Sequence, residues 1–348
     1  MKKLYFAIVF IITLLSTVFG QERPLAAPGE RHLKNIRQLS FGGENAEAYF
    51  SFDGKQLIFQ SKRDGRGCDQ IYSMNIDGSN VKMVSGGEGR TTCSYFFKGG
   101  KKVLYASTHG GKKECPPNPD FSKGYVWAIY PDYDIYTATP DGKNIQHLTN
   151  TPGYDAEATI SPNGKKIIFT SERDGDLDLY SMDANGKNVK RLTSELGYDG
   201  GAFYSPDSKQ IVYRGSHPTT PEDIKKYKDL LGQHLIVPTT FEVWTMNADG
   251  SNKRQVTKLN AASFAPFYTP DGKRITFCTN YFATDARKRN FDLAMINVDG
   301  TGLERITFNE SFDGFPMFSP DGKKLVFASN RNAATTGDTN VFIADWVK

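Results

Sequence analysis

A hairpin signal built on Ser-Pro-Asp-Gly recurs along the whole chain and constrains the fold more than any other feature of the sequence. Six copies occur, and they begin at Ser51, Phe97, Ser161, Ser205, Thr269 and Ser319. The bare repeat is about 45 residues long, and two copies carry insertions of about 20 further residues. A period of about 45 residues is typical of a four-stranded propeller blade, so the repeat predicts six blades.

Each turn is followed by segments that suit the remaining strands of a blade. The second strand is rich in β-branched and aromatic residues, as in Leu57-Ile58-Phe59, and the third alternates, as in Asp178-Leu179-Tyr180. A tight Asp-Gly or Asn-Gly turn and a short fourth strand such as Arg191-Leu192-Thr193 close the unit.

The two ends of the repeat region complete each other. The sixth copy stops after its third strand at Trp346-Val347-Lys348, whereas Ile36-Arg37-Gln38-Leu39 has the pattern of a fourth strand without a blade of its own. Pairing the two would remove open strand edges. We therefore predict an all-β fold: a single six-bladed β-propeller over residues 33–348, closed by pairing an N-terminal strand with the C-terminal blade and preceded by a short segment over residues 21–32.

The first twenty residues have the pattern of a secretory signal peptide. Lys2 and Lys3 precede an apolar run that is shorter than the roughly 20 residues a membrane-spanning helix needs. We expect residues 1–20 to be a signal peptide cleaved after Gly20. The mature protein is then expected in the periplasm or outside the cell, with no membrane span and as a monomer.

Charge argues against a nucleic-acid partner. The chain has 43 basic and 39 acidic residues, and Lys and Arg form no basic stripe along the repeats. We therefore expect no nucleic acid to bind.

The succession Arg-Leu-Thr, Ser-Pro-Asp-Gly, Phe-x-Ser-x-Arg-Asp-Gly and Asp-Leu-Tyr-x-Met resembles the WD-repeat-like propeller of the TolB family. The resemblance spans residues 33–348 and is strongest between Tyr154 and Thr193. It implies a periplasmic role like that of TolB in the Tol-Pal envelope system, although residues 21–32 leave no room for that family's N-terminal α/β domain. The repeat also resembles those of a metal-using oligogalacturonate lyase and of propellers fused to serine peptidases. The G-x-S-x-G elbow of the peptidases does not occur here.

One face of the predicted ring carries all the long irregular segments. Tight Gly turns fall at one end of each blade, whereas insertions over residues 110–132 and 218–240 fall at the other, which we call the loop face. The second insertion predicts a helix with Thr220 as N-cap, Pro221 at its first position and Gly232 past its end. Either the aromatic residues of the insertions pack onto the propeller and each other, or the insertions flank a cleft that suits a glycan or peptide.

Aligned repeats place polar residues around the channel mouth at this face. Carboxylates near the starts of the first strands alternate with cations at the ends of the second strands, and such an arrangement either pairs as a structural lattice or binds a ligand. The candidate binding residues, with Trp127 from the first insertion, are Asn45, Glu47, Arg63, His109, Trp127, Asp155, Glu157, Arg173, Asp199, His217, Asp313 and Arg331.

His109 and His217 replace Arg in the two blades with insertions, and imidazole beside carboxylates can bind Zn or Mn. They are our candidate ligands for a divalent cation at the channel mouth, and we expect no other cofactor. We assign no catalytic residue, and expect a non-catalytic propeller that binds a cell-envelope protein, glycan or peptide. The alternative is a metal-assisted lyase or hydrolase that acts on acidic glycans.

Three of the four cysteines map to the loop face near the first two blades. They are Cys68, Cys93 and Cys115, whereas Cys278 lies in an apolar strand where a buried thiol is ordinary. In an oxidising compartment one disulfide is expected, joining either Cys93 to Cys115 or Cys68 to Cys93.

Overall fold

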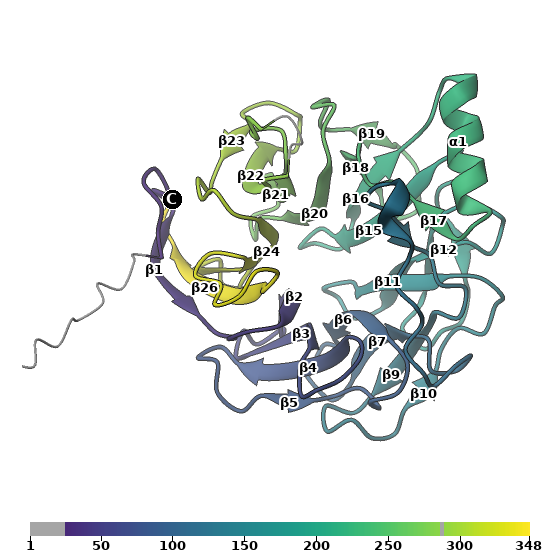
Figure 1. Ribbon diagram of the computed structural model, residues 1–348, viewed down its shortest axis with the longest axis horizontal. Helices are drawn as coiled ribbons and strands as arrows, with labels where there is room; N and C mark the ends of the chain where they lie inside the picture. Colours follow the sequence, from purple (N-terminus) through teal and green to yellow (C-terminus); the bar gives the residue numbers. More distant parts are fainter. Residues whose placement is uncertain (1–24, 286–288) are drawn as a thin grey trace, which may run out of the picture.

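Six four-stranded antiparallel sheets surround a central channel in the computed structural model, which describes residues 25–285 and 289–348 (Figure 1). The predicted all-β, six-bladed propeller is therefore confirmed. The predicted signal peptide over residues 1–20 lies outside the described residues. Among the residues described, no helix has the length and apolar character needed to cross a bilayer.

The blades follow one another along the chain, and the first strand of each lies nearest the channel. Blade one contains β2 (Glu44–Phe50), β3 (Gln56–Lys62), β4 (Gln70–Asn75) and β5 (Lys82–Met83). Blade two contains β6 (Thr91–Phe96), β7 (Val103–Ser107), β9 (Asp134–Ala138) and β10 (Gln146–His147). Blade three contains β11 (Asp155–Ile160), β12 (Lys166–Ser171), β13 (Asp178–Asp183) and β14 (Lys190–Arg191).

The second half of the ring repeats this order until the last blade. Blade four contains β15 (Tyr198–Tyr204), β16 (Gln210–Ser216), β18 (Glu242–Asn247) and β19 (Arg254–Gln255). Blade five contains β20 (Ser263–Tyr268), β21 (Arg274–Thr279), β22 (Asp292–Asn297) and β23 (Glu304–Arg305). Blade six contains β24 (Asp313–Phe318), β25 (Lys324–Ser329), β26 (Asn340–Trp346) and the N-terminal β1 (Leu33–Gln38).

The ring closes in blade six, where β1 pairs antiparallel with β26. Arg37 lies opposite Ile343 and Gln38 opposite Phe342. Just beyond β1, the Leu39 amide donates a hydrogen bond to the Val341 carbonyl (2.8 Å). The predicted pairing of the two chain ends is confirmed, so the two edges cover each other.

An aromatic residue at one repeated position of every second strand fills the interior of its blade. These residues are fully buried: Phe59, Tyr105, Phe169, Tyr213, Phe277 and Phe327. Burying an aromatic side chain stabilises a fold by roughly 2–3 kcal/mol, so this one position supplies a large share of the apolar driving force.

Every first strand contains a β-bulge at the same place, and its bulged residue has a positive φ. The register shifts inside all six first strands. The bulged residues are Glu47, Cys93, Glu157, Gly201, Ala265 and Phe315, with φ between 48° and 57°. We call these six residues the bulge ring. A bulge turns one side chain away from the regular alternation of its strand, and all six members line the narrow part of the channel.

The two insertions meet each other instead of flanking an open cleft, so the first of the two predicted alternatives, packing, holds and the second does not. The first contains the 3-10 helix η1 (Phe121–Lys123) and β8 (Trp127–Ala128), and the second contains α1 (Pro221–Leu231) and β17 (Leu235–Ile236). Strands β8 and β17 pair antiparallel. Ile129, Leu231 and Ile236 pack in one buried cluster that extends to blade three. Burial of this apolar surface favours contact between the insertions over an open cleft.

Helix α1 forms where the sequence predicts it. The Thr220 side chain accepts a hydrogen bond from the Asp223 amide, Pro221 occupies the first turn, and Gly232 follows the last residue. Its Tyr227 hydroxyl donates to Asp176 Oδ1 of blade three (2.5 Å), which fixes the helix above that blade.

Candidate functional site

Three of the six blades pair the predicted carboxylate with the predicted cation of the same blade: Asp155 with Arg173, Asp199 with His217, and Asp313 with Arg331. In blade three, Arg173 Nη2 lies 2.9 Å from Asp155 Oδ2, and the guanidinium also lies over the Phe169 and Tyr180 rings. Arg63 has no such carboxylate, since blade one carries the buried Asn45 at the equivalent position; it lies over the Phe59 and Tyr72 rings instead. These contacts therefore connect the start of the first strand of a blade to the residues that follow its second strand.

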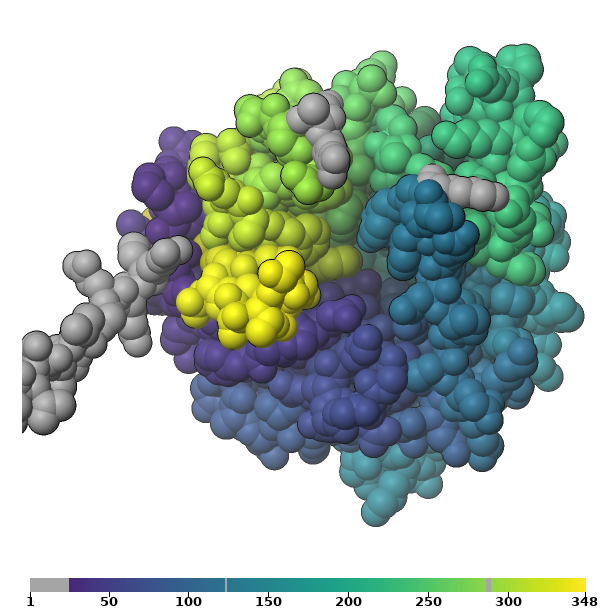
Figure 2. Space-filling view, in the orientation of Figure 1, coloured from purple at the N-terminus to yellow at the C-terminus, as the bar shows by residue number. Residues whose placement is uncertain are grey.

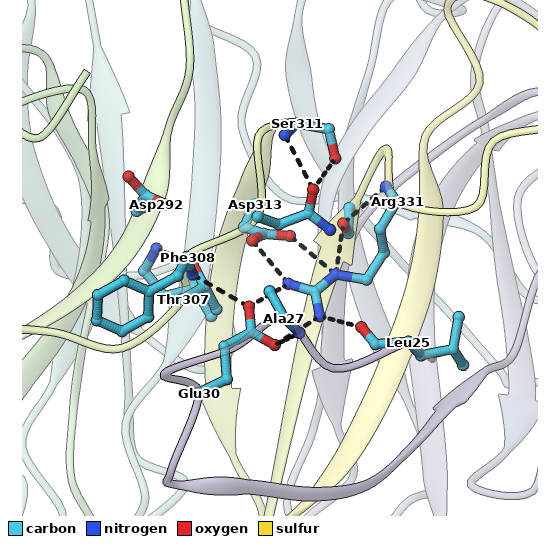
Figure 3. A network of polar contacts seen from close by, with 12 residues as sticks. Leu25, Ala27, Glu30, Asp292, Thr307, Phe308, Ser311, Asp313 and Arg331 are labelled. Atoms are coloured by element: carbon cyan, nitrogen blue, oxygen red, sulfur yellow. Dashed lines mark hydrogen bonds and ion pairs between the residues drawn. The ribbon is translucent and has the colours of Figure 1, made fainter. Parts of the chain in front are cut away.

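The blade six version of this pair recruits the N-terminal segment (Figure 3). Arg331 Nη2 lies 2.8 Å from Asp313 Oδ2 and 3.0 Å from Glu30 Oε1, and Arg331 Nη1 donates to the Leu25 carbonyl (2.8 Å). Glu30, Asp313 and Arg331 are all buried. Two carboxylates sharing one guanidinium attach the segment before β1 to the blade that β1 closes.

The two candidate metal-binding histidines have separate surroundings. His109 packs against the Tyr136 ring with centroids 4.1 Å apart, and its Nδ1 lies 2.7 Å from Ser107 Oγ. His217 Nε2 lies 3.0 Å from Asp199 Oδ1, a buried carboxylate of its own blade. Within the part of the chain that the structure describes, no three His, Cys, Asp or Glu side chains group as metal ligands.

The disulfide joins Cys68 to Cys115, so both predicted pairings were wrong. The bond connects the loop between β3 and β4 to the first insertion. Cys93 and Cys278 are free. The prediction failed because Cys93 is a member of the bulge ring, which turns its side chain into the channel and away from the loops that carry the other two thiols.

A large pocket lies where the first insertion reaches over the channel mouth. It has a volume of about 540 Å³, and Figure 2 shows the loop face hollowed between the teal insertion and the yellow C-terminal blade. Its aromatic walls come from the insertion and from blades three to six. These walls are Phe121, Tyr125, Trp127, Tyr130, Tyr133, Tyr154, Tyr198, Phe264, Phe312 and Phe315. We call this hollow the mouth pocket.

The structure brings three of the predicted binding residues into the mouth pocket: Glu47, Trp127 and Glu157. Asn45 borders an adjoining hollow of about 390 Å³ at blades one and six. His217 borders a separate one of about 630 Å³ beside α1. The remaining predicted residues, which do not line the mouth pocket, are Arg63, His109, Asp155, Arg173, Asp199, Asp313 and Arg331.

Glu157 is fully engaged at the base of the pocket. Its carboxylate pairs with Arg214 of β16 and accepts hydrogen bonds from Tyr198 Oη (2.6 Å) and the Gly201 amide (2.9 Å). The Arg214 guanidinium lies 5.2 Å from the Trp127 ring centroid. This network holds a buried charge pair against an aromatic wall, where charge-assisted hydrogen bonds are strong.

Glu47, across the channel, has no such partner. Its Oε2 is buried and accepts no hydrogen bond among the residues described. Burial raises the pKa of Glu47 to about 7, and the carboxylates of Glu157 and Asp69 act in the same direction. A hydrogen bond with Cys93 and the charge of Arg214 oppose that rise in pKa.

Sequence reasoning missed Arg214, although the sequence contained a signal for it. In the other five blades the equivalent residues are Gln60, Ala106, Thr170, Cys278 and Ala328, all of which are uncharged. An Arg in this position, directly after the apolar Ile211-Val212-Tyr213, needs a buried acid. Glu157 of the neighbouring blade is that acid.

Comparison with known proteins agrees with the repeat and its geometry. Residues 128–222 match a family model described as the TolB beta propeller domain. The chain is similar to the TolB propeller domain. Over 192 residues it is 27% identical to a protein TolB homolog from Chlorobium chlorochromatii, and the match covers 47% of this chain and 43% of that relative. The TolB-like propeller therefore matches less than half the length of this curated relative.

Solved structures share the fold at low sequence identity. TolB from Acinetobacter baumannii superposes with a TM-score of 0.57 at 17% identity, which covers 88% of this chain and 64% of that one. An oligogalacturonate lyase from Vibrio parahaemolyticus superposes with a TM-score of 0.52 at 12% identity, covering 89% of this chain and 93% of that one. At such identities the likeness concerns the fold.

Proposed function

We propose that this TolB-like propeller is an exported, non-catalytic binding protein that holds a cell-envelope protein, or an extended glycan or peptide, in its mouth pocket. The observation that carries this proposal is the concentration of aromatic side chains around a hollow of about 540 Å³ on the loop face. Ligand sites are typically concave and lined by aromatic residues with a few polar groups.

Two exposed residues at the rim of the pocket have no role in the core. Phe121 is 53% exposed and Tyr125 is 67% exposed. Their rings stack on each other within the first insertion. Large exposed aromatics gathered at one hollow mark an interaction site.

Export is supported by the signal pattern of residues 1–20 and by the disulfide between Cys68 and Cys115. Disulfides persist in oxidising compartments such as the periplasm. The proposed location is therefore the periplasm or the exterior, where envelope partners are found.

The test is capture of envelope proteins by the purified chain, compared with a Phe121→Ser/Tyr125→Ser double variant. Because both side chains are exposed, the variant should fold normally and retain at most about one tenth of the captured partner. Tyr281→Ser is the matched control, since Tyr281 is 45% exposed and does not line the mouth pocket. Recovery of a peptidoglycan-associated lipoprotein would support a Tol-like role, and equal capture by all three proteins would contradict the proposed site.

The second candidate, a metal-assisted lyase or hydrolase acting on acidic glycans, is favoured only by the fold shared with oligogalacturonate lyase. Metal analysis of the purified protein tests it. A stoichiometric Mn or Zn that disappears in a His109→Ala/His217→Ala double variant would support the enzyme, whereas ligand binding that is unchanged in metal-free protein would contradict it.

A further inference from the structure

The charged side chains of the mouth pocket leave one carboxylate without a cation. The pocket is lined by four acidic residues, Glu44, Glu47, Asp69 and Glu157, and by three basic residues, Lys62, Arg90 and Arg214. Each basic residue has its own acid. Lys62 Nζ lies 3.6 Å from Glu44 Oε1, Arg90 Nε lies 3.9 Å from Asp69 Oδ2, and Arg214 pairs with Glu157. Glu47 is the acid that remains.

The bulge in β2 holds Glu47 in this position. Glu47 is a member of the bulge ring, with a φ of 53°, and the bulge directs its side chain to the channel. Its Oε2 atom is buried and has no hydrogen-bond partner among the residues described. A buried carboxylate that has only a thiol hydrogen bond, here with Cys93, and no cation of its own is destabilising unless it is protonated or meets a positive group. The site is therefore suited to a cation that comes from outside the chain.

The shape of the channel restricts which class of ligand can place a positive group beside Glu47. Glu47 lines both the mouth pocket and the narrow part of the channel beneath it, and this narrow part has a volume of only about 20 Å³. A lysine or arginine side chain has a slender apolar stem with a charged end, so it can pass an aromatic wall and place its charge at depth. An amino group fixed directly to a sugar ring has no such reach.

The aromatic wall favours the same ligand. Phe264, Phe312 and Phe315 line the mouth pocket together with Glu47. Aromatic faces attract ammonium and guanidinium groups, and the attraction is stronger where water is excluded. The pocket thus offers one carboxylate that is not paired with a cation, next to an aromatic wall.

We propose that the mouth pocket binds an extended peptide segment by inserting one lysine or arginine side chain, whose positive group pairs with Glu47. This inference rests on the proposed binding function and names the ligand class. Its distinguishing feature is a requirement for one cationic side chain, in addition to the aromatic contacts.

The test uses a bead-bound library of random heptapeptides with acetylated amino termini, screened with the wild type and with Glu47→Gln. The wild type should select peptides with a shared Lys or Arg, and Glu47→Gln should not. Resynthesis of a selected peptide with norleucine at that position should weaken binding to the wild type at least about tenfold and leave binding to Glu47→Gln unchanged. A free-amine version of the norleucine peptide shows whether a terminal ammonium can substitute for the side chain.

Glu222→Gln is the matched control, because Glu222 is exposed on α1 and does not line the mouth pocket. The control should select the same basic peptides as the wild type. Selection without a shared Lys or Arg, selection that persists in Glu47→Gln, or no selected peptide would each overturn the inference. The Phe121→Ser/Tyr125→Ser capture experiment is independent, so loss of capture there with no basic preference here would leave the proposed function standing.

Discussion

At the scale of single residues, the mouth pocket combines two largely buried acids in opposite situations. Glu157 has a cation and several hydrogen-bond donors, whereas Oε2 of Glu47 has no donor among the residues described. The same side-chain chemistry therefore has different effects on stability and pH response at two positions of one ring.

Glu47 should make the protein less stable as pH rises. Its pKa is about 7 in the folded chain against an ordinary value of 4.5. The folded state therefore holds a proton that the unfolded state releases between these values. Its stabilising contribution is present below pH 4.5 and is lost as pH rises through about 7, an effect of about 3 kcal/mol.

The measurement is the free energy of unfolding in guanidinium chloride for the wild type and Glu47→Gln from about pH 4 to about pH 8. The difference between the two proteins isolates Glu47 from Glu157, Arg214, Asp69 and Cys93, which face it in both. A pH-independent difference would contradict the expectation.

Arg214 should be essential because it compensates Glu157. Arg214→Met is expected to reduce stability by about 3–5 kcal/mol, since it leaves a buried carboxylate without its cation. Adding Glu157→Gln should restore part of that loss, and a double-mutant cycle measures how much. Strictly additive losses would show that the pair is not coupled.

At the scale of elements, the disulfide connects two loops that the strands alone leave independent. It joins residues separated by 47 positions, from blade one to the first insertion. The pocket wall contributed by that insertion is therefore attached covalently at one end and through β8–β17 at the other.

The Cys68→Ser/Cys115→Ser variant should lose about 4 kcal/mol of stability, because the closed loop no longer restricts the unfolded chain. Peptide mapping of the wild type should recover Cys68 linked to Cys115, and Cys93→Ser should keep that link. A peptide joining Cys93 to either of the others would contradict the structure.

The sequence predicted those elements that a local pattern of residues determines, but it did not predict contacts between segments that are far apart in the chain. Thr220, Pro221 and Gly232 define the helix locally, and the structure places it there. The β8–β17 contact joins segments about a hundred residues apart through short strands with no periodic signal of their own. Cys93 was misassigned because alignment gives its blade and strand but not the direction that a bulge imposes on its side chain.

At the scale of the whole molecule, the ring depends on a joint between the chain ends that is not covalent. The Leu39 amide bonds to the Val341 carbonyl across that joint, and the Val84 amide makes the equivalent bond to the Ile71 carbonyl inside blade one, both at 2.8 Å. The first bond connects the N-terminal strand to the C-terminal blade, whereas the second lies within blade one, whose four strands follow one another in the chain.

Leu39→Pro should therefore destabilise all six blades, whereas Val84→Pro should act mainly on blade one. Each removes one backbone donor and leaves a buried carbonyl without its hydrogen bond, which costs roughly 1–3 kcal/mol. Hydrogen exchange followed by mass spectrometry measures this, with loss of protection expected throughout the ring only for Leu39→Pro. Equal, local losses in the two variants would show that closure does not govern the ring.

The bulge ring separates the chemistry of the channel from the architecture that surrounds it. The six bulges occupy equivalent places in their strands, yet they present glutamate, cysteine, glutamate, glycine, alanine and phenylalanine. The bulge therefore tolerates side chains as different as those of glutamate, cysteine, alanine and phenylalanine, as well as glycine, at the same positive φ. Selection can thus alter ligand preference by replacing a few inward-facing side chains while the sheets keep their pairing, and homologous propellers with different ligands should diverge first at these six places.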